Sequence, residues 1–182
     1  FDLRLPDTLR LTKYKHIAEW FMGIKRRTEI EFGHLNMSNY DEFSKLFYGQ
    51  KLEVDVAGVP HVFGMGGIHG AIDEFIYECK DDEIMLMVDV DSMYPSMMIQ
   101  YDLLSRAVTN KNRFINIYNT NLRFKAEGNK KRREPFKRIC NITYGATRDK
   151  YNAMYDPLHG NLICLFGQLF LLDLIEKLED HV

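Results

Sequence analysis

Residues 85–96 read MLMVDVDSMYPS, an apolar run followed by two aspartates, a tyrosine and a proline. The continuous apolar character of residues 83–90 predicts a strand in the interior of a sheet. Tyr94-Pro95 is expected to end the extended chain, with a helix starting near Ser96. Asp89 would then lie at the end of the strand, where a lone buried carboxylate costs several kcal/mol unless it is paired, hydrogen-bonded or bound to a metal.

Two interpretations of Asp89 and Asp91 are open on the residues alone. Aspartates that follow a strand are most often turn and cap residues, because their carboxylates accept hydrogen bonds from nearby backbone N–H groups. They are also ligands of the type that Mg²⁺ takes, usually one or two carboxylates together with substrate phosphates. The apolar run up to Asp89 and the basic segment that follows it favour the magnesium site.

Charge is divided unevenly along the chain. The chain has 24 basic and 26 acidic residues, a net charge of −2. Residues 106–150 hold 13 Lys or Arg and three acids, a local charge of +10, which leaves −12 on the remainder. Such a segment is suited to a polyanion, and its binding would depend steeply on salt.

Length and composition describe a folded chain of one domain, or one domain and a piece. The 182 residues are 46% hydrophobic and 13% aromatic, which excludes a disordered or low-complexity chain. The cysteines Cys79, Cys140 and Cys164 form no CxxC pair, so we expect no disulfide framework or zinc cluster and a reducing compartment. Residues 162–175 are shorter than the roughly 20 residues of a membrane span and predict a buried helix. The first residue, Phe1, is not Met, which suggests a piece of a longer protein.

Apolar periodicity and turn residues predict the elements. Helices are expected over residues 12–31, 39–49, 111–127, 130–144 and 160–180. Residues 51–63 alternate like extended chain with a turn at residues 58–60, and residues 64–70 (GMGGIHG) form a glycine-dense loop. Gly128-Asn129 would join two antiparallel helices into a hairpin that holds nearly all the basic residues.

A second group of functional side chains lies on the second helix of that hairpin. Lys137, Asn141 and Tyr144 are separated by four and three residues, so they share one helical face. A cation, an amide and an aromatic ring on one stripe suit a phosphate, a base edge and a sugar. A solvated basic helix whose tyrosine packs inward is an equally open interpretation.

Both segments resemble motifs of family B DNA polymerases of the phage type. Residues 89–96 (DVDSMYPS) resemble the first palm motif, Asp-x-x-Ser-Leu-Tyr-Pro-Ser, and residues 137–145 (KRICNITYG) resemble the fingers motif, Lys-x-x-x-Asn-Ser-x-Tyr-Gly. Residues 155–168 are similar to the palm helix that follows in this family, and residues 64–70 to the glycine-rich loop upstream of it. The motifs stand in the family's order, and the resemblance covers about residues 51–182.

The resemblance implies an α+β fold, with a polymerase palm sheet, packed helices and an antiparallel helical fingers hairpin. Residues 1–50 would be an N-terminal helical segment, either a linker or the palm edge. Residues 51–105 would be palm with the glycine-rich loop and the catalytic strand, 106–150 the fingers hairpin, and 151–182 a palm helix. The second metal motif of the family, an Asp-x-Asp on a strand later than the palm helix, is absent from the sequence. We therefore expect a palm-and-fingers fragment that is inactive alone in primer extension.

The implied activity is template-directed transfer of a nucleotide from a deoxynucleoside triphosphate to a primer 3′-hydroxyl. Two Mg²⁺ ions, or Mn²⁺ in their place, would act in the intact enzyme. The implied catalytic residues are Asp89, Lys137 and Tyr94, and the implied metal ligands are Asp89 and the carbonyl of Val90. The implied nucleotide-binding residues are Ser92, Met93, Tyr94, Arg123, Lys130, Lys137, Asn141 and Tyr144. The implied DNA-binding residues are Gly66, Gly67, His69, Tyr144 and Gly145.

Some positions depart from the family pattern, and other functions stay open. Met93 replaces the usual Leu, and Ile142 and Thr143 replace the usual Ser and apolar residue. Arg123, with Lys130 or Lys125 second, is the candidate for the outer phosphates, although its spacing is not the common one. The expected partners are primer-template DNA and deoxynucleoside triphosphates in the cytoplasm, of an infected host cell if the protein is viral, with no membrane. The alternatives are a non-catalytic nucleic-acid-binding module, a polymerase remnant, or a reverse transcriptase or RNA polymerase.

Overall fold

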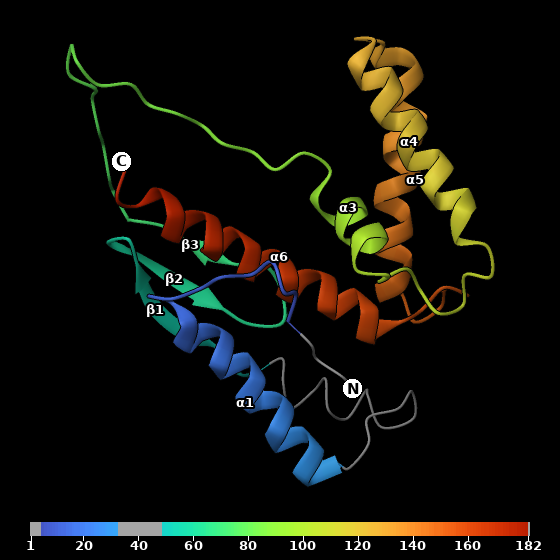
Figure 1. The fold of residues 1–182 in the computed structure, drawn as a ribbon, viewed down its shortest axis with the longest axis horizontal. Coiled ribbons are helices and arrows are strands. Elements are labelled where there is room, and N and C mark those ends of the chain that lie inside the picture. The colour runs from blue at the N-terminus through green and yellow to red at the C-terminus, as the bar shows by residue number, and fades with distance from the viewer. Residues whose placement is uncertain (1–4, 33–48, 182) are drawn as a thin grey trace.

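A computed structural model describes residues 5–32 and 49–181 of the chain (Figure 1). The described elements are α1 (Lys15–Phe32), β1 (Leu52–Val56), β2 (Val59–Phe63), β3 (His69–Gly70), α3 (Met93–Gln100), α4 (Lys111–Ala126), α5 (Lys130–Arg148) and α6 (Pro157–Leu178). The helices predicted over residues 12–31, 111–127, 130–144 and 160–180 are confirmed with shifted ends. The helix predicted over residues 39–49 lies almost wholly outside the described residues.

The described strands form one small antiparallel sheet in the order β1-β2-β3. Leu52 lies opposite Phe63 and Val56 opposite Val59. The turn between β1 and β2 is made by Ala57 and Gly58, with φ angles of 52° and 76°, as a two-residue hairpin turn requires. The predicted extended segment is therefore confirmed, and the mixture of helices with an antiparallel sheet is the α+β class.

The predicted strand over residues 83–90 is wrong. This segment belongs to an irregular stretch, residues 71–92, that runs outside the sheet as the long green chain in Figure 1. Ile84 is 82% exposed and Met87 97% exposed. An apolar run becomes an interior strand only when strands pair with it on both sides, and within the described residues no strand does so. Asp89 consequently lies on an exposed segment rather than at a buried strand end.

The helix after Asp91 begins earlier than expected. It starts at Met93, so Tyr94-Pro95 lies inside its first turn rather than ahead of it. Proline is compatible with a first turn because that turn's N–H groups have no partner within the helix. Pro95, Met97 and Met98 are buried, and α3 packs against α6.

The long helix α6 is the centre of the core. Its buried side chains include Ile163, Leu169 and Leu172, and α1, the sheet and α3 surround it in Figure 1. Asp156 caps its first turn and Pro157 occupies the first position, where proline is favoured. By length and composition alone α6 could cross a membrane, but most of its apolar stretch is buried against the rest of the protein.

Candidate nucleotide-binding site

One face of α5 carries a row of side chains suited to a nucleotide. Arg133, Lys137, Asn141 and Tyr144 follow one another at steps of four, four and three residues, which places them on one side of a helix. Lys137 and Asn141 are exposed, whereas Arg133 and Tyr144 are partly buried. We call these four residues the α5 stripe. The helix rise gives it a length of about 16 Å.

The start of α3 contacts both ends of the α5 stripe. At one end the ring centroids of Tyr94 and Tyr144 are 4.5 Å apart at an interplanar angle of 37°. At the other end an Asp91 carboxylate oxygen lies 3.8 Å from a guanidinium nitrogen of Arg133. Lys137 and Asn141 lie between these two contacts, with their side chains open to solvent. The palm-like and fingers-like motifs, distant in sequence, therefore meet in one surface.

The backbone before α3 has an unusual conformation. Ser92 adopts φ 52° and ψ 38°, the left-handed region, and its side chain does not cap the helix. This conformation costs a non-glycine residue about 1–2 kcal/mol. Ser96 Oγ donates to the Ser92 carbonyl over 2.9 Å and hydrogen-bonds to the Tyr118 hydroxyl of α4 over 2.8 Å. The N–H groups at Ser92 and Met93 thus stand at an anchored helix N-terminus, the kind of backbone that binds anions.

Tyr144 is held at its hydroxyl end. Burial, together with a hydrogen bond of 2.9 Å to Cys164 Sγ, raises the pKa of the Tyr144 phenol well above its usual range, and the nearby Arg148 opposes this in part. Burial raises the pKa of Tyr94 as well. Both phenols therefore stay neutral at physiological pH. The two rings, tilted against each other, form an uncharged aromatic end of the site, opposite the cationic end at Arg133.

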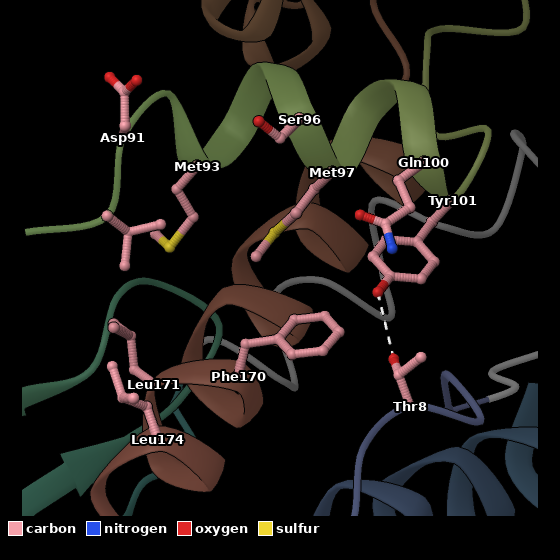
Figure 2. Close-up of a pocket in the computed structure, with 11 residues that line it drawn as sticks. Thr8, Asp91, Met93, Ser96, Met97, Gln100, Tyr101, Phe170, Leu171 and Leu174 are labelled. Atoms are coloured by element: carbon pink, nitrogen blue, oxygen red, sulfur yellow. Dashed lines mark hydrogen bonds between the residues drawn. The ribbon is translucent and has the colours of Figure 1, made fainter.

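Asp91, which has no assigned metal role, turns toward the helical hairpin. Besides Arg133 it forms an ion pair with Lys125 of α4. The hydrogen bond from Lys125 is the largest of the effects that lower the pKa of Asp91 below its ordinary value, and burial opposes them. Figure 2 shows the Asp91 carboxylate pointing away from the apolar side chains between α3 and α6. Asp91 therefore belongs to the charged surface rather than to the interior.

An apolar cavity of about 310 Å³ lies between α3 and α6 (Figure 2). Met93, Met97, Phe170 and Leu174 are among its lining residues. At the far end the Tyr101 hydroxyl lies 3.4 Å from Thr8 Oγ1. Asp91, Ser96 and Gln100 also line the cavity, but most of its surface is apolar. We therefore assign it to packing behind the charged surface.

Asp89 and Val90 line a second cavity, of about 380 Å³, together with Ile68 and Gly70 beside the glycine loop. An aspartate carboxylate and a backbone carbonyl are hard oxygen donors, the type that Mg²⁺ takes. Within residues 5–32 and 49–181, however, no group of three or more His, Cys, Asp or Glu side chains is placed to hold a metal ion. The donor set fits Mg²⁺ only as part of a site that phosphate oxygens or further carboxylates complete.

The glycine loop is attached to α6 by a residue that the sequence did not single out. Gln168 is 1% exposed. Its Nε2 donates to the carbonyls of Gly64 and Gly66, each over 2.8 Å, and its Oε1 accepts from the Gly64 N–H over 3.3 Å. Gly66, Gly67 and His69 remain exposed around a cavity of about 350 Å³. The available signal was an amide that interrupts the apolar run of residues 162–172.

The remaining predicted residues are placed unevenly around the site. Arg123 lies over the Phe124 ring, 5.1 Å from its centroid, and 3.9 Å from Glu127, so the α4 cation that reaches residues 91–94 is Lys125 instead. Lys130 lies three residues before Arg133 and extends the α5 stripe by one turn. A side chain added at Gly145 would meet no other atom within 4 Å, which leaves open space beside Tyr144.

Arg133 was not predicted, although its spacing from Lys137 repeats that from Lys137 to Asn141. Periodicity alone could have found it.

Comparisons with protein-family models, with curated proteins and with solved structures found no match to this chain.

Proposed function

We propose that the surface between α3 and the α5 stripe binds a deoxynucleoside triphosphate and serves in template-directed DNA synthesis. One observation carries the proposal. Two contacts, from Asp91 to Arg133 and from Tyr94 to Tyr144, bracket an exposed lysine and amide on the same helical face. A nucleotide has the same order of chemical groups, with a polyanion at one end and an aromatic base at the other.

The polar residues of the surface suit the phosphate end of such a ligand. Lys137 would act as a point charge toward phosphate oxygens, and the planar guanidinium of Arg133 suits two oxygens at once. The N–H groups at Ser92 and Met93 would add neutral donors. These fixed donors would neutralise charge that develops on the phosphates during transfer.

The aromatic end suits the sugar and base. Tyr94 and Tyr144 present neutral rings, and a nucleoside can lie against them by stacking. Asn141 would then reach the sugar or the phosphates from the middle of the stripe. Mg²⁺, with the Asp89 carboxylate and the Val90 carbonyl as ligands, would supply Lewis-acid stabilisation of the transferred phosphate.

Primer-template DNA is the proposed second ligand. Residues 106–150 carry a local charge of +10, which attracts the phosphate backbone whatever the base sequence. Gly66, Gly67 and His69 are exposed and offer close approach to a backbone without bulky side chains. A non-catalytic nucleic-acid-binding module is the second candidate, favoured by the same basic hairpin. That alternative predicts DNA binding without any preference for nucleoside triphosphates.

Substitution of Lys137 tests the proposal. Lys137→Met is expected to weaken binding of Mg²⁺-deoxyadenosine triphosphate by the 182-residue chain about tenfold or more, because a charge-assisted hydrogen bond contributes about 1.5–3 kcal/mol. Isothermal titration calorimetry at fixed salt measures the change.

Lys131→Met is the matched control for Lys137→Met. Lys131 is exposed on the same helix but lies two residues before Arg133, on the opposite side from the stripe. Its replacement removes the same charge and is expected to change the affinity less than twofold. Equal losses of affinity in the two variants would mean that binding depends only on net charge, and would favour the nucleic-acid-binding module.

A further inference from the structure

Asp91 joins the start of α3 to both helices of the hairpin. Its carboxylate forms an ion pair with Lys125 from the last turn of α4 and lies 3.8 Å from Arg133 in the first turn of α5. The Ser92 hydroxyl approaches the same carboxylate at 3.5 Å. One anion therefore sits between two cations that different helices supply.

The Arg133 cation is held in place without Asp91. Its Nε donates over 3.2 Å to Asn121 Oδ1, and Asn121 is 1% exposed on α4. The Arg133 side chain is 23% exposed, so most of it is already fixed by the hairpin. A positioned guanidinium beside a lysine is suited to phosphate, which accepts several hydrogen bonds at once.

The other acids of the hairpin helices pair within their own helix. Glu127 lies beside Arg123, and Glu134 beside Arg138, each four residues away. Asp102 reaches α4 from another element, but at one cation, Lys111. Asp91 differs because it contacts cations of both hairpin helices. Its side chain is 46% exposed and that of Lys125 is 43% exposed, so solvent and a competing anion have access to the pair.

We propose that Asp91 is an internal ligand that occupies the Lys125–Arg133 cation pair and that a polyphosphate displaces it. The inference rests on the proposed function for the identity of the natural ligand, a nucleoside triphosphate. Without ligand, the Asp91 contacts tie the hairpin to the start of α3. A polyphosphate carries several charges and competes with one carboxylate for the same cations. Its binding therefore breaks the contacts of Asp91 with Lys125 and Arg133. Lys125 and Arg133 thereby become the phosphate contacts of α4 and α5.

Binding of inorganic tripolyphosphate to the 182-residue chain tests the competition. Asp91→Asn keeps the shape of the side chain but removes its charge. It is expected to tighten tripolyphosphate binding about fivefold, the scale of an exposed ion pair, and the gain should shrink as salt is raised. Lys125→Met and Arg133→Met are each expected to weaken binding. The Asp91→Asn gain should be much smaller when Lys125→Met is already present, because the two changes share one interaction.

Glu134→Gln is the matched control. It changes the net charge by the same amount and frees Arg138 on α5, because Glu134 forms its ion pair with Arg138. The ion pairs of Lys125 and Arg133 are with Asp91 instead. Its effect on tripolyphosphate binding is expected to stay below twofold. Equal gains in Asp91→Asn and Glu134→Gln would overturn the proposal, as would an Asp91→Asn chain that binds no tripolyphosphate.

The probe separates this inference from the proposed function, because tripolyphosphate has no sugar or base. In one outcome, Asp91→Asn tightens tripolyphosphate binding but deoxyadenosine triphosphate binds no better than tripolyphosphate. That result supports Asp91 as an internal ligand and contradicts the proposed nucleotide site. In the other outcome, the nucleotide binds better than tripolyphosphate and depends on Lys137, but Asp91→Asn leaves both affinities unchanged. That result supports the nucleotide site and contradicts the role of Asp91 as an internal ligand.

Discussion

Asp89→Asn is expected to reduce primer extension about a thousandfold or more in a polymerase that contains this chain. The substitution keeps the size of the side chain but removes the negative charge that would hold Mg²⁺ beside the Val90 carbonyl. Loss of Lewis-acid stabilisation of several kcal/mol corresponds to at least that factor in rate. Single-turnover incorporation of one nucleotide measures the loss, since it separates chemistry from product release.

Asp81→Asn is the control for that experiment. Asp81 is exposed in the same irregular stretch as Asp89 and is expected to leave extension unchanged. DNA binding is measured in parallel and should be nearly equal in all three proteins. A parallel loss of DNA binding and extension in Asp89→Asn would point to misfolding and contradict the metal role. The 182-residue chain alone is expected to give no extension, because the proposed metal site has one carboxylate, Asp89, and needs further ligands to hold the ions.

Asp156→Ala is expected to destabilise the fold by about 2–3 kcal/mol, because it removes charge-assisted hydrogen bonds from Arg106 and the cap of α6. Asp156 is 2% exposed, and its carboxylate accepts hydrogen bonds from the Arg106 side chain over 2.8 and 2.9 Å. It also accepts from the backbone N–H groups of Arg106 and His159. The same carboxylate joins the loop before the hairpin to the start of α6. Chemical denaturation measures the change.

The Asp156 interaction also sets a pH dependence. Burial opposes ionisation of this carboxyl, but the hydrogen bonds from Arg106 outweigh it and hold the pKa below its ordinary value. A lowered folded-state pKa stabilises the fold above the unfolded pKa of about 4, and the contribution is lost as the pH falls through the folded value. The wild-type chain should therefore lose stability below about pH 4, and Asp156→Ala should lose less over that range.

An exposed aspartate provides the comparison for Asp156. Asp81→Ala is expected to change the free energy of unfolding by less than about 0.5 kcal/mol, as for surface positions without special contacts. Two results would contradict a role for the Asp156 carboxylate in holding α6 to the loop before the hairpin. One is a loss of stability as small as that of Asp81→Ala, and the other is the same decrease in stability below about pH 4 as in the wild type.

Local patterns predicted the helices because each helix carries its own signals. The hairpin turn is a clear case. Gly128 has a φ of 67°, and Asn129 caps α5 by accepting from the Arg132 N–H over 3.2 Å. Asp156 and Pro157 mark the start of α6 in the same way. Capping and turn chemistry act over a few residues, so a single sequence contains them.

The sheet could not be predicted to the same extent, because strand pairing depends on distant residues. The apolar run of residues 83–90 indicates that the segment suits a buried position, but it does not indicate which strand lies beside it. In the described structure the run is exposed and irregular. The early start of α3 has a different cause, since Pro95 is as compatible with a first helical turn as with a break.

The candidate site was predicted where helical periodicity applies and missed where contacts cross between elements. Lys137, Asn141 and Tyr144 were found from spacing, and the same spacing extends to Arg133. The ion pair between Asp91 and Lys125 was not predictable, because no local pattern relates a loop before α3 to the last turn of α4. Gln168 was likewise visible only as an interruption of an apolar helix.

Mapping of nucleotide binding by nuclear magnetic resonance tests the central claim most directly. The ¹⁵N-labelled 182-residue chain is titrated with Mg²⁺-deoxyadenosine triphosphate, and amide shifts are followed residue by residue. We expect the largest shifts at Ser92, Met93 and along residues 133–144, with saturation and with loss in Lys137→Met. Shifts concentrated on α1 or the β1–β2 turn, or no saturable shift at all, would contradict a nucleotide site between α3 and α5.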